Sequence, residues 1–100
     1  MDDNKEINSE KLDFSTLEAR LEELDSAAFT QAERECRMAA DPTPDIMYSS
    51  SFRGRLAAAA YGVQYSEIRK LKLPEYVAVI ERVLAFLLQT LGETAIQGNN

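Results

Sequence analysis

The residue types that most often perform catalysis are nearly absent from this chain. It has no histidine and a single cysteine, Cys36. A Ser-His-Asp triad, a Cys-His pair and a zinc site built from histidines and cysteines are therefore excluded. One cysteine forms no internal disulfide, and Cys36 fits best as a small apolar residue on one face of a helix.

The other polar residues form no catalytic or metal-binding pattern. Glu18, Glu22 and Glu23 share a short predicted helix, but nothing around them in the sequence would raise the pKa of a carboxylate for acid–base chemistry. The segment from Asp41 to Asp45 lacks the glycine and the closing glutamate of a calcium loop. The four glycines are scattered, so no phosphate-binding loop is formed. We predict that the protein is not an enzyme and uses no metal or cofactor.

One set of spaced residues matches the apolar skeleton of a helix-turn-helix. It comprises Ala58, Gly62, Val63, Ile68 and Leu71. Two interpretations stay open: a plain corner between two helices, or a small DNA-binding transcriptional regulator. The second helix would offer Arg69, Lys70 and Lys72 to DNA, but Pro74 stops it soon afterwards.

The last predicted helix, residues 75–91, is apolar over well over half of its circumference. A helix of this kind must be buried on most sides, and a chain of 100 residues offers limited cover. It is therefore either the central core helix, or part of an oligomer interface or of a groove for an apolar partner segment. The predicted interaction residues are Val77, Ile80, Leu84, Leu87 and Leu91.

Charge is distributed unevenly along the chain. Residues 1–25 hold nine acids and three bases, whereas residues 46–100 hold four acids and six bases. The net charge of −6 argues against a general nucleic-acid binder, whose surface should be basic. The acidic N-terminal arm is either a solvated tail or a segment that folds over the basic half.

Targeting signals were sought in the same sequence. The first residues, MDDNKE, do not resemble a signal peptide. The longest uncharged runs, residues 56–66 and 83–92, hold 11 and 10 residues. Both are too short for a membrane span of about 20 residues, so no membrane partner is expected.

The periodicity of apolar residues predicts an all-α protein with four to five short helices, a tight helix-glycine-helix corner and a strongly apolar C-terminal helix. We expect residues 1–12 to be a disordered acidic tail, residues 13–92 a single helical domain and residues 93–100 a frayed tail. The predicted helices cover about nine residues from Ser15, and then residues 26–39, 46–61, 67–72 and 75–91.

Residues at the predicted helix ends have the types that favour helix starts and stops. Ser15 and Glu18 have the spacing of a capping box. The expected caps of the later helices are Asp25 or Ser26, Asp45 (with Ser51 as an alternative start) and Ser66. Two prolines at 42 and 44 predict a break in the chain. Gly62 and Gly92 are expected to end their helices, the former with a left-handed residue.

About half of the chain, from Asp41 to Leu88, resembles the middle of the tail assembly chaperones of long-tailed phages and prophages. The similar parts are the run DPTPDIMY followed by Phe52, the run LAAAAYGV that ends at Val63, a short helix EIRKL, and a final helix that begins at Tyr76 and contains Phe86 and Leu87. The alanine-rich helix with its glycine corner and the Phe-Leu ending are the most specific of these.

The resemblance implies a function and a set of partners. Chaperones of this family bind the tape-measure protein before the tail tube polymerises around it, keep it soluble, and help to recruit tube subunits. Membership would place the chain in the cytoplasm of a bacterial host and outside the mature virion. We expect it to form homo-oligomers. The alternatives that stay open are the helix-turn-helix regulator and a plain oligomerisation module.

Overall fold

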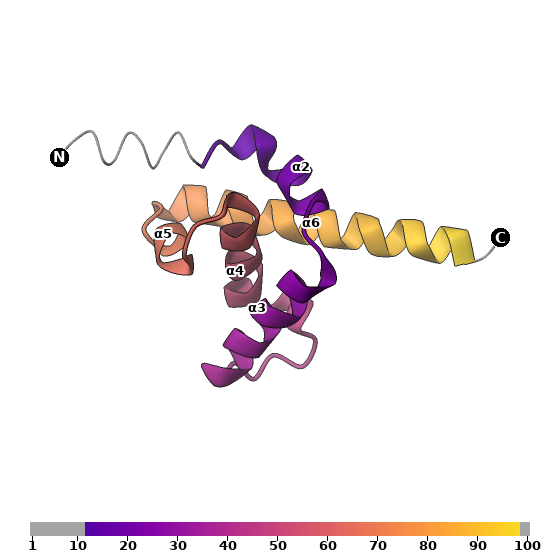
Figure 1. The fold of residues 1–100 in the computed structure, drawn as a ribbon, viewed down its shortest axis with the longest axis horizontal. Helices are drawn as coiled ribbons and strands as arrows, with labels where there is room; N and C mark the ends of the chain where they lie inside the picture. The colour runs from indigo at the N-terminus through magenta and orange to yellow at the C-terminus, as the bar shows by residue number, and fades with distance from the viewer. Residues whose placement is uncertain (1–11, 99–100) are drawn as a thin grey trace.

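The computed structural model describes residues 12–98, and for residues 91–98 only the backbone. Within this range the chain is all-α, as predicted, with no strand (Figure 1). The predicted tail lies outside the described residues except for Leu12, which is buried in the core. In chain order the elements are η1 (Phe14–Thr16), α2 (Leu17–Glu22), α3 (Ser26–Met38), η2 (Ile46–Tyr48), α4 (Ser50–Tyr61), α5 (Tyr65–Arg69) and α6 (Leu73–Gly98).

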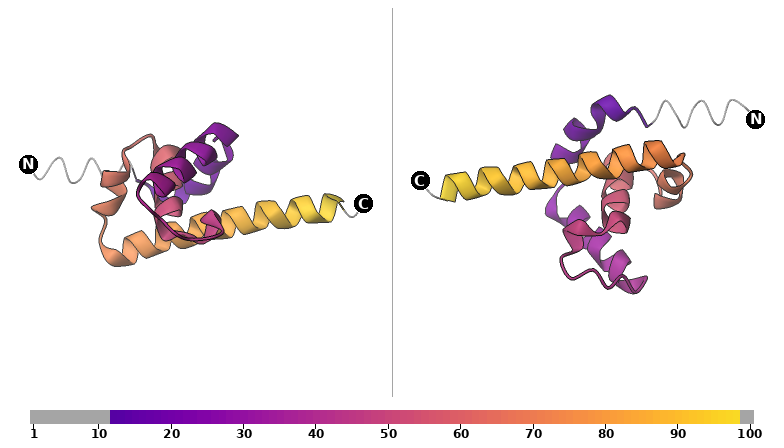
Figure 2. Two further views of the ribbon diagram at one scale, coloured as in Figure 1. Left: turned by 90° about the horizontal axis from the view of Figure 1, so that it is seen from below. Right: turned by 180° about the vertical axis from the view of Figure 1, so that it is seen from behind.

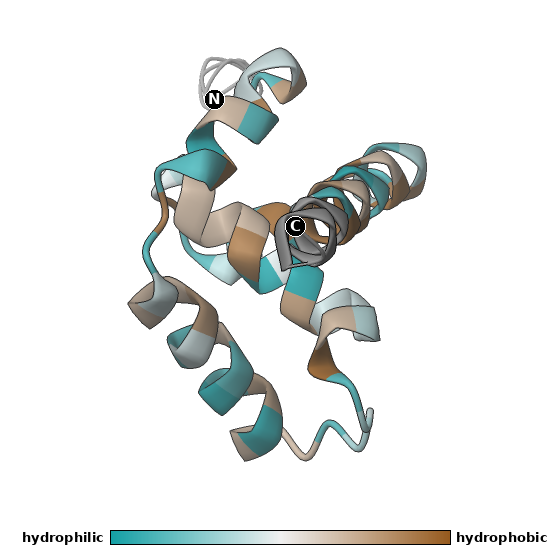
Figure 3. Cartoon of the chain, turned by 90° about the vertical axis from the view of Figure 1, so that its right-hand side faces the viewer, coloured by the Kyte–Doolittle hydropathy of each residue, from teal (hydrophilic) through white to brown (hydrophobic). Residues whose placement is uncertain are grey.

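The central helix of the domain is α4. It contacts α2, α3, α5 and α6, and Figure 3 shows hydrophobic residues along it where its neighbours pass. Buried residues occupy most of its circumference, which is expected of a helix with neighbours on several sides. These are Phe52, Arg53, Gly54, Leu56, Ala57, Ala58 and Tyr61. Sequence analysis offered residues 75–91 as the alternative central helix, but α4 has that position.

The longest helix is α6, whose 26 residues correspond to a rod of about 39 Å. Its first half packs on α4 and α2, and its second half extends beyond the other helices (Figures 1 and 2). The prediction that it ends at Gly92 was wrong, because the helix continues to Gly98. One glycine inside a helix costs only about 1 kcal/mol, and no proline follows it to force a stop.

The starts of the first two α-helices test the predicted caps. Asp25 caps α3 as expected, accepting a hydrogen bond of 3.1 Å from the amide of Ala28. The capping box of Ser15 and Glu18 is not formed. Instead, Asp13 accepts bonds from the amide and the hydroxyl of Ser15, at 3.0 and 2.7 Å, and starts the turn η1 before α2. Asp and Ser are both good caps, so two cap residues this close in the sequence compete.

The third predicted helix is divided in two. Asp45 caps the short turn η2, and a separate helix, α4, begins after Ser49, whose hydroxyl accepts a bond of 3.2 Å from the amide of Phe52. Gly62 ends α4 with φ of 71°, as predicted. The prediction that Ser66 caps α5 was wrong, because α5 begins at Tyr65, two residues earlier than expected, and has Gln64 in the cap position.

Two side-chain bonds to backbone carbonyls attach the N-terminal segment to the later helices. The hydroxyl of Tyr61, on α4, donates to the carbonyl of Asp13 at 3.0 Å. The guanidinium of Arg82, on α6, donates to the carbonyl of Phe14, also at 3.0 Å. Leu17 and Leu21 of α2 are buried in the same core, so this segment is an integral part of the domain.

The loop between α3 and α4 is held by a hydrogen-bond network. Arg37 donates to the carbonyls of Asp41 and Thr43, both at 2.8 Å, and of Pro44 at 3.3 Å. The carboxylate of Asp41 accepts bonds from the amide and hydroxyl of Thr43 and from the hydroxyl of Ser49. The bond from Ser49, followed by those from Thr43, lowers the pKa of Asp41 to about 2.

This network predicts how stability responds to acid. The folded-state pKa of Asp41, about 2, lies below its ordinary value of 3.8, so its contribution to stability is complete above about pH 4 and is lost as the pH falls toward 2. Asp41→Asn should therefore reduce the fall in the free energy of unfolding between pH 4 and 2, measured by urea titration. Thr43→Val, which removes one donor, should act in the same direction by less. Parallel pH profiles for wild type and Asp41→Asn would contradict the assignment.

A glycine inside α4 lets α5 and the start of α6 approach closely. A Cβ atom at Gly54 would lie 2.8 Å from Cε1 of Tyr65 and 3.2 Å from the hydroxyl oxygen of Tyr76. The guanidinium of Arg55 stacks on the Tyr65 ring at 4.4 Å. The hydroxyl of Tyr76 donates to the carbonyl of Ser50 at 3.4 Å. Burial, and secondarily its bond with Tyr65, raises the pKa of Tyr76 to about 12, so this hydroxyl stays protonated.

Gly54→Ala sets two effects against each other. Alanine is a better helix former than glycine by about 1 kcal/mol, but overpacking typically costs about 1–3 kcal/mol. Because both tyrosines are held in place, we expect a net loss of about 1 kcal/mol in the free energy of unfolding, measured by urea denaturation. A gain of stability would show that the Tyr65 ring turns away without cost.

Candidate interaction surface

The helix α6 has an inward face and an outward apolar face. On the inward face, Val79 and Val83 are completely buried in the core that α4 and α2 share. On the outward face, Val77 and Leu88 are 43% and 42% exposed. They are among the most exposed large apolar side chains of the described part of the chain.

The structure divides the five predicted interaction residues between these two faces. Ile80 is buried, and Leu87 is half-buried against the core. Val77 is exposed, and Leu84 is half-buried like Leu87 but, unlike it, is not packed against the core cluster. The side chain of Leu91 lies outside the described part of the structure. The structure therefore does not bring the predicted set together on one open surface.

The open apolar surface consists of Val77, Leu84 and Leu88, which we call the α6 strip. These residues are seven and then four positions apart, so they lie on one side of the helix within about 40°. The predicted set did not include Leu88, because that set was chosen by alternating steps of three and four residues, which pass through Ile80 and Leu87. The i, i+7, i+11 spacing indicates the outward set, but the apolar spacing that includes Ile80 and Leu87 is just as regular in the sequence.

Charge beside the α6 strip comes from Glu81, whose side chain is 64% exposed. It lies 3.9 Å from the guanidinium of Arg53, whose side chain is only 10% exposed. Arg53 also donates to the carbonyls of Ile80 at 3.3 Å and Ser49 at 3.4 Å. The acid is therefore open to solvent while its basic neighbour is covered, and the accessible charge at the α6 strip is negative.

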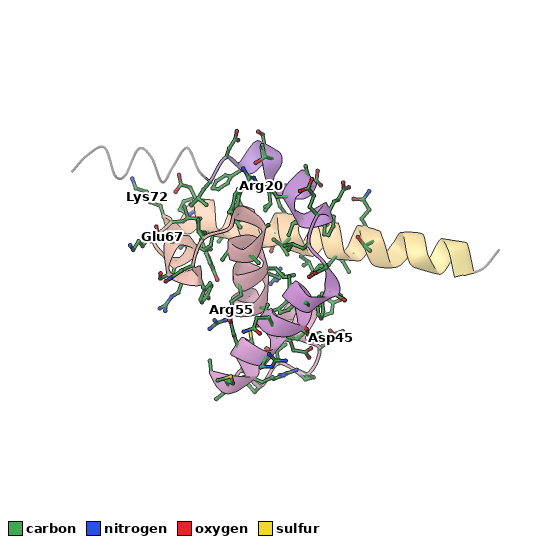
Figure 4. The ribbon with its side chains drawn as sticks, viewed as in Figure 1. Arg20, Asp45, Arg55, Glu67 and Lys72 are labelled. Carbon is green, nitrogen blue, oxygen red and sulfur yellow. The ribbon has the colours of Figure 1, made fainter. Side chains whose placement is uncertain are left out.

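A second concave surface lies between α3 and α4. It is a groove of about 420 Å³ lined by alanines of both helices and by polar side chains. Arg55, labelled in Figure 4, lines this groove, forms an ion pair of 3.2 Å with Glu35 and stacks on Tyr65. The main charges of the groove are thus already paired within the chain.

The helix-glycine-helix corner holds the basic residues that a DNA-binding function would need. Its second helix, α5, has five residues and is only about 7.5 Å long. Lys70 pairs with Glu67 at 3.2 Å, and Arg69 lies 5.9 Å from the Tyr65 ring. Figure 4 shows both Lys72 and Glu67 at the α5 end of the domain. Acid and base are therefore mixed on the surface of the corner.

The described part of the chain also bears on two other kinds of site. Among the side chains that the structure describes, no three of the metal-binding types lie close enough to hold an ion. No helix among the same residues has the length and apolar character needed to cross a membrane. Comparison with known protein families, with curated proteins and with solved structures finds no match to this chain.

Two neighbouring leucines test the division of α6 into faces. Leu87→Asp places a charge against the core and should lower the free energy of unfolding by about 2 kcal/mol or more. Leu88→Asp places the same charge on the outward side and should change it by no more than about 0.5 kcal/mol. Urea denaturation followed by circular dichroism measures both. Equal losses in the two variants would mean that Leu88 is part of the core.

Proposed function

We propose that this chain is a tail assembly chaperone of a long-tailed phage or prophage. In this role it binds the tape-measure protein in the host cytoplasm, keeps it soluble and assists assembly of the tail tube, without remaining in the mature virion. The observation that carries the proposal is the α6 strip, an apolar surface on a helix that extends beyond its own domain.

The two faces of α6 have different roles, since one packs on the domain and the other is open to a partner. The inward face anchors the helix through Val79 and Val83, so the outward face is presented on a rigid element. Apolar strips of this kind bind amphipathic helices of partner proteins. The tape-measure protein must stay soluble before the tube forms around it, so its apolar helices need such a partner.

The location of the family resemblance also supports the proposal. The residues that carry it, 41–88, include η2, α4, α5 and the packed part of α6. They contain the central helix, the Gly62 corner and the α6 strip together. The resemblance thus covers the part of the domain that positions the proposed binding surface.

No specific observation favours the helix-turn-helix alternative. A recognition helix must enter the major groove with several side chains, whereas α5 has five residues. One of its basic neighbours, Lys70, is paired with Glu67. Binding to DNA at low salt is the experiment to perform if the test of the chaperone function fails.

Co-expression with the client tests the proposal. The product of whichever open reading frame just downstream of this gene is longest is expressed alone and together with this chain, and its soluble fraction is measured. We expect the client to be soluble only in the presence of the chain and to co-purify with it. Leu88→Asp should reduce recovery of the complex at least fivefold, because it places a charge in the α6 strip.

The matched control is Met38→Ser, which removes an exposed apolar side chain from the end of α3. It should recover the complex as well as wild type does. A client that is soluble alone, or that ignores the chain, would contradict the proposed function. Full recovery of the complex with Leu88→Asp would place client binding elsewhere on the surface.

A further inference from the structure

We infer that the α6 strip takes an amphipathic helix of another protein that carries a lysine or arginine opposite Glu81. The inference rests on the proposed function, since it specifies the chemistry of the client segment. It follows from the dimensions of the strip, from the charge within it and from the positions of the neighbouring arginines.

The dimensions favour a helical occupant. Val77 and Leu88 are 11 positions apart, which is about 16 Å along α6. A partner helix of about three turns spans this length and places apolar residues three and four positions apart against the strip. An occupant of this length covers Leu84 and also Glu81, which lies within about 40° of the middle of the strip.

Covering Glu81 determines the charge of the occupant. Its carboxylate is 64% exposed and therefore hydrated. A docked apolar helix removes that water, and a carboxylate without a new partner then carries a desolvation cost. Arg53 offsets this cost only in part, because its guanidinium lies 3.9 Å from the carboxylate, which is long for an ion pair, and also donates to two backbone carbonyls. A base on the docking helix supplies a closer partner.

The same argument disfavours a second copy of this chain as the occupant. A two-fold interface through the α6 strip would bury Glu81 twice. Among the described residues, the base closest to it along α6 is Arg82, which lies about 100° further around the helix and donates to the carbonyl of Phe14. Along the described part of α6, a copy therefore brings a second acid to the interface and no further base to match it.

Two synthetic helical peptides test the charge preference with the full-length chain. Both carry the same apolar face of leucines and alanines, one with lysines and the other with glutamates along its edge. Binding is measured by fluorescence anisotropy at 150 mM salt. We expect the lysine peptide to bind wild type more tightly, and Leu88→Asp to weaken its binding at least tenfold.

Matched neutralisations separate a local contact from the overall acidity of the chain. Glu81→Gln and Glu22→Gln both change the net charge from −6 to −5, but Glu22 is an exposed residue of α2 and is not part of α6. Glu81→Gln should reduce the preference for the lysine peptide about two- to fivefold, the size of one exposed ion pair. Glu22→Gln should leave the preference unchanged, and thermal melts establish that both variants fold.

Three results would overturn the inference, and a fourth would overturn the proposed function instead. Equal effects of Glu81→Gln and Glu22→Gln would mean that the preference for the lysine peptide comes from long-range attraction to the net negative charge of the chain. A wild-type dimer in light scattering that becomes monomeric in Leu88→Asp would show that a second copy covers the strip. A client that stays soluble and bound to Glu81→Gln with unchanged affinity would leave the chaperone function standing without this site. If the peptide preference depends on Glu81 but the chain does not solubilise the client, this binding site would stand and the chaperone function would be overturned.

Discussion

The narrow cross-section of α4 is the constraint on which the rest of the structure depends. Four helices pack around one helix of 12 residues, and the distance between packed helices is set by the side chains at their contact. Gly54, Ala57 and Ala58 keep that distance short where α4 is most enclosed. The large apolar side chains of the core come mainly from the surrounding helices, among them Leu17, Ile68, Val79 and Val83.

The helix α6 is more than twice as long as the central helix. With 12 residues α4 is about 18 Å long, whereas α6 with 26 residues is about 39 Å long. Figures 1 and 2 show α4 running across α6 rather than along it, so contact between the two helices is confined to part of α6. The second half of α6 extends beyond the other helices, and the α6 strip stays open because it lies on another side of the helix than the buried Val79 and Val83.

Local signals predicted the elements better than they predicted which surfaces would meet. Asp25 at the start of α3, Gly62 at the end of α4 and the break at residues 41–45 each follow from the backbone preferences of single residues, and all three were anticipated. The central role of α4 was not, because alanine, glycine and a buried arginine, Arg53, carry little hydropathic contrast.

For the candidate surface, the sequence identified the correct helix but not its outward side. The periodicity of α6 contains two ladders of equal quality, and only packing against α4 and α2 determines which one is buried. Leu87 and Leu88 are adjacent leucines with opposite surroundings, and no property of the residue type distinguishes them. The open side of a helix is a property of its neighbours, so it could not be predicted before those neighbours were placed.

The two carbonyls that receive Tyr61 and Arg82 also affect the order in which the domain is completed. Asp13 and Phe14 lie 48 and 68 residues before these donors, whereas α4, α5 and α6 are consecutive in the chain. Contacts between distant residues form later than local ones, since a longer loop must close first. On a ribosome adding roughly 5–20 residues per second, Phe14 waits about 3–14 s for the synthesis of Arg82. The segment that contains Asp13 and Phe14 is therefore made early but packs late, and it has no bond to Tyr61 or Arg82 until these residues have been synthesised.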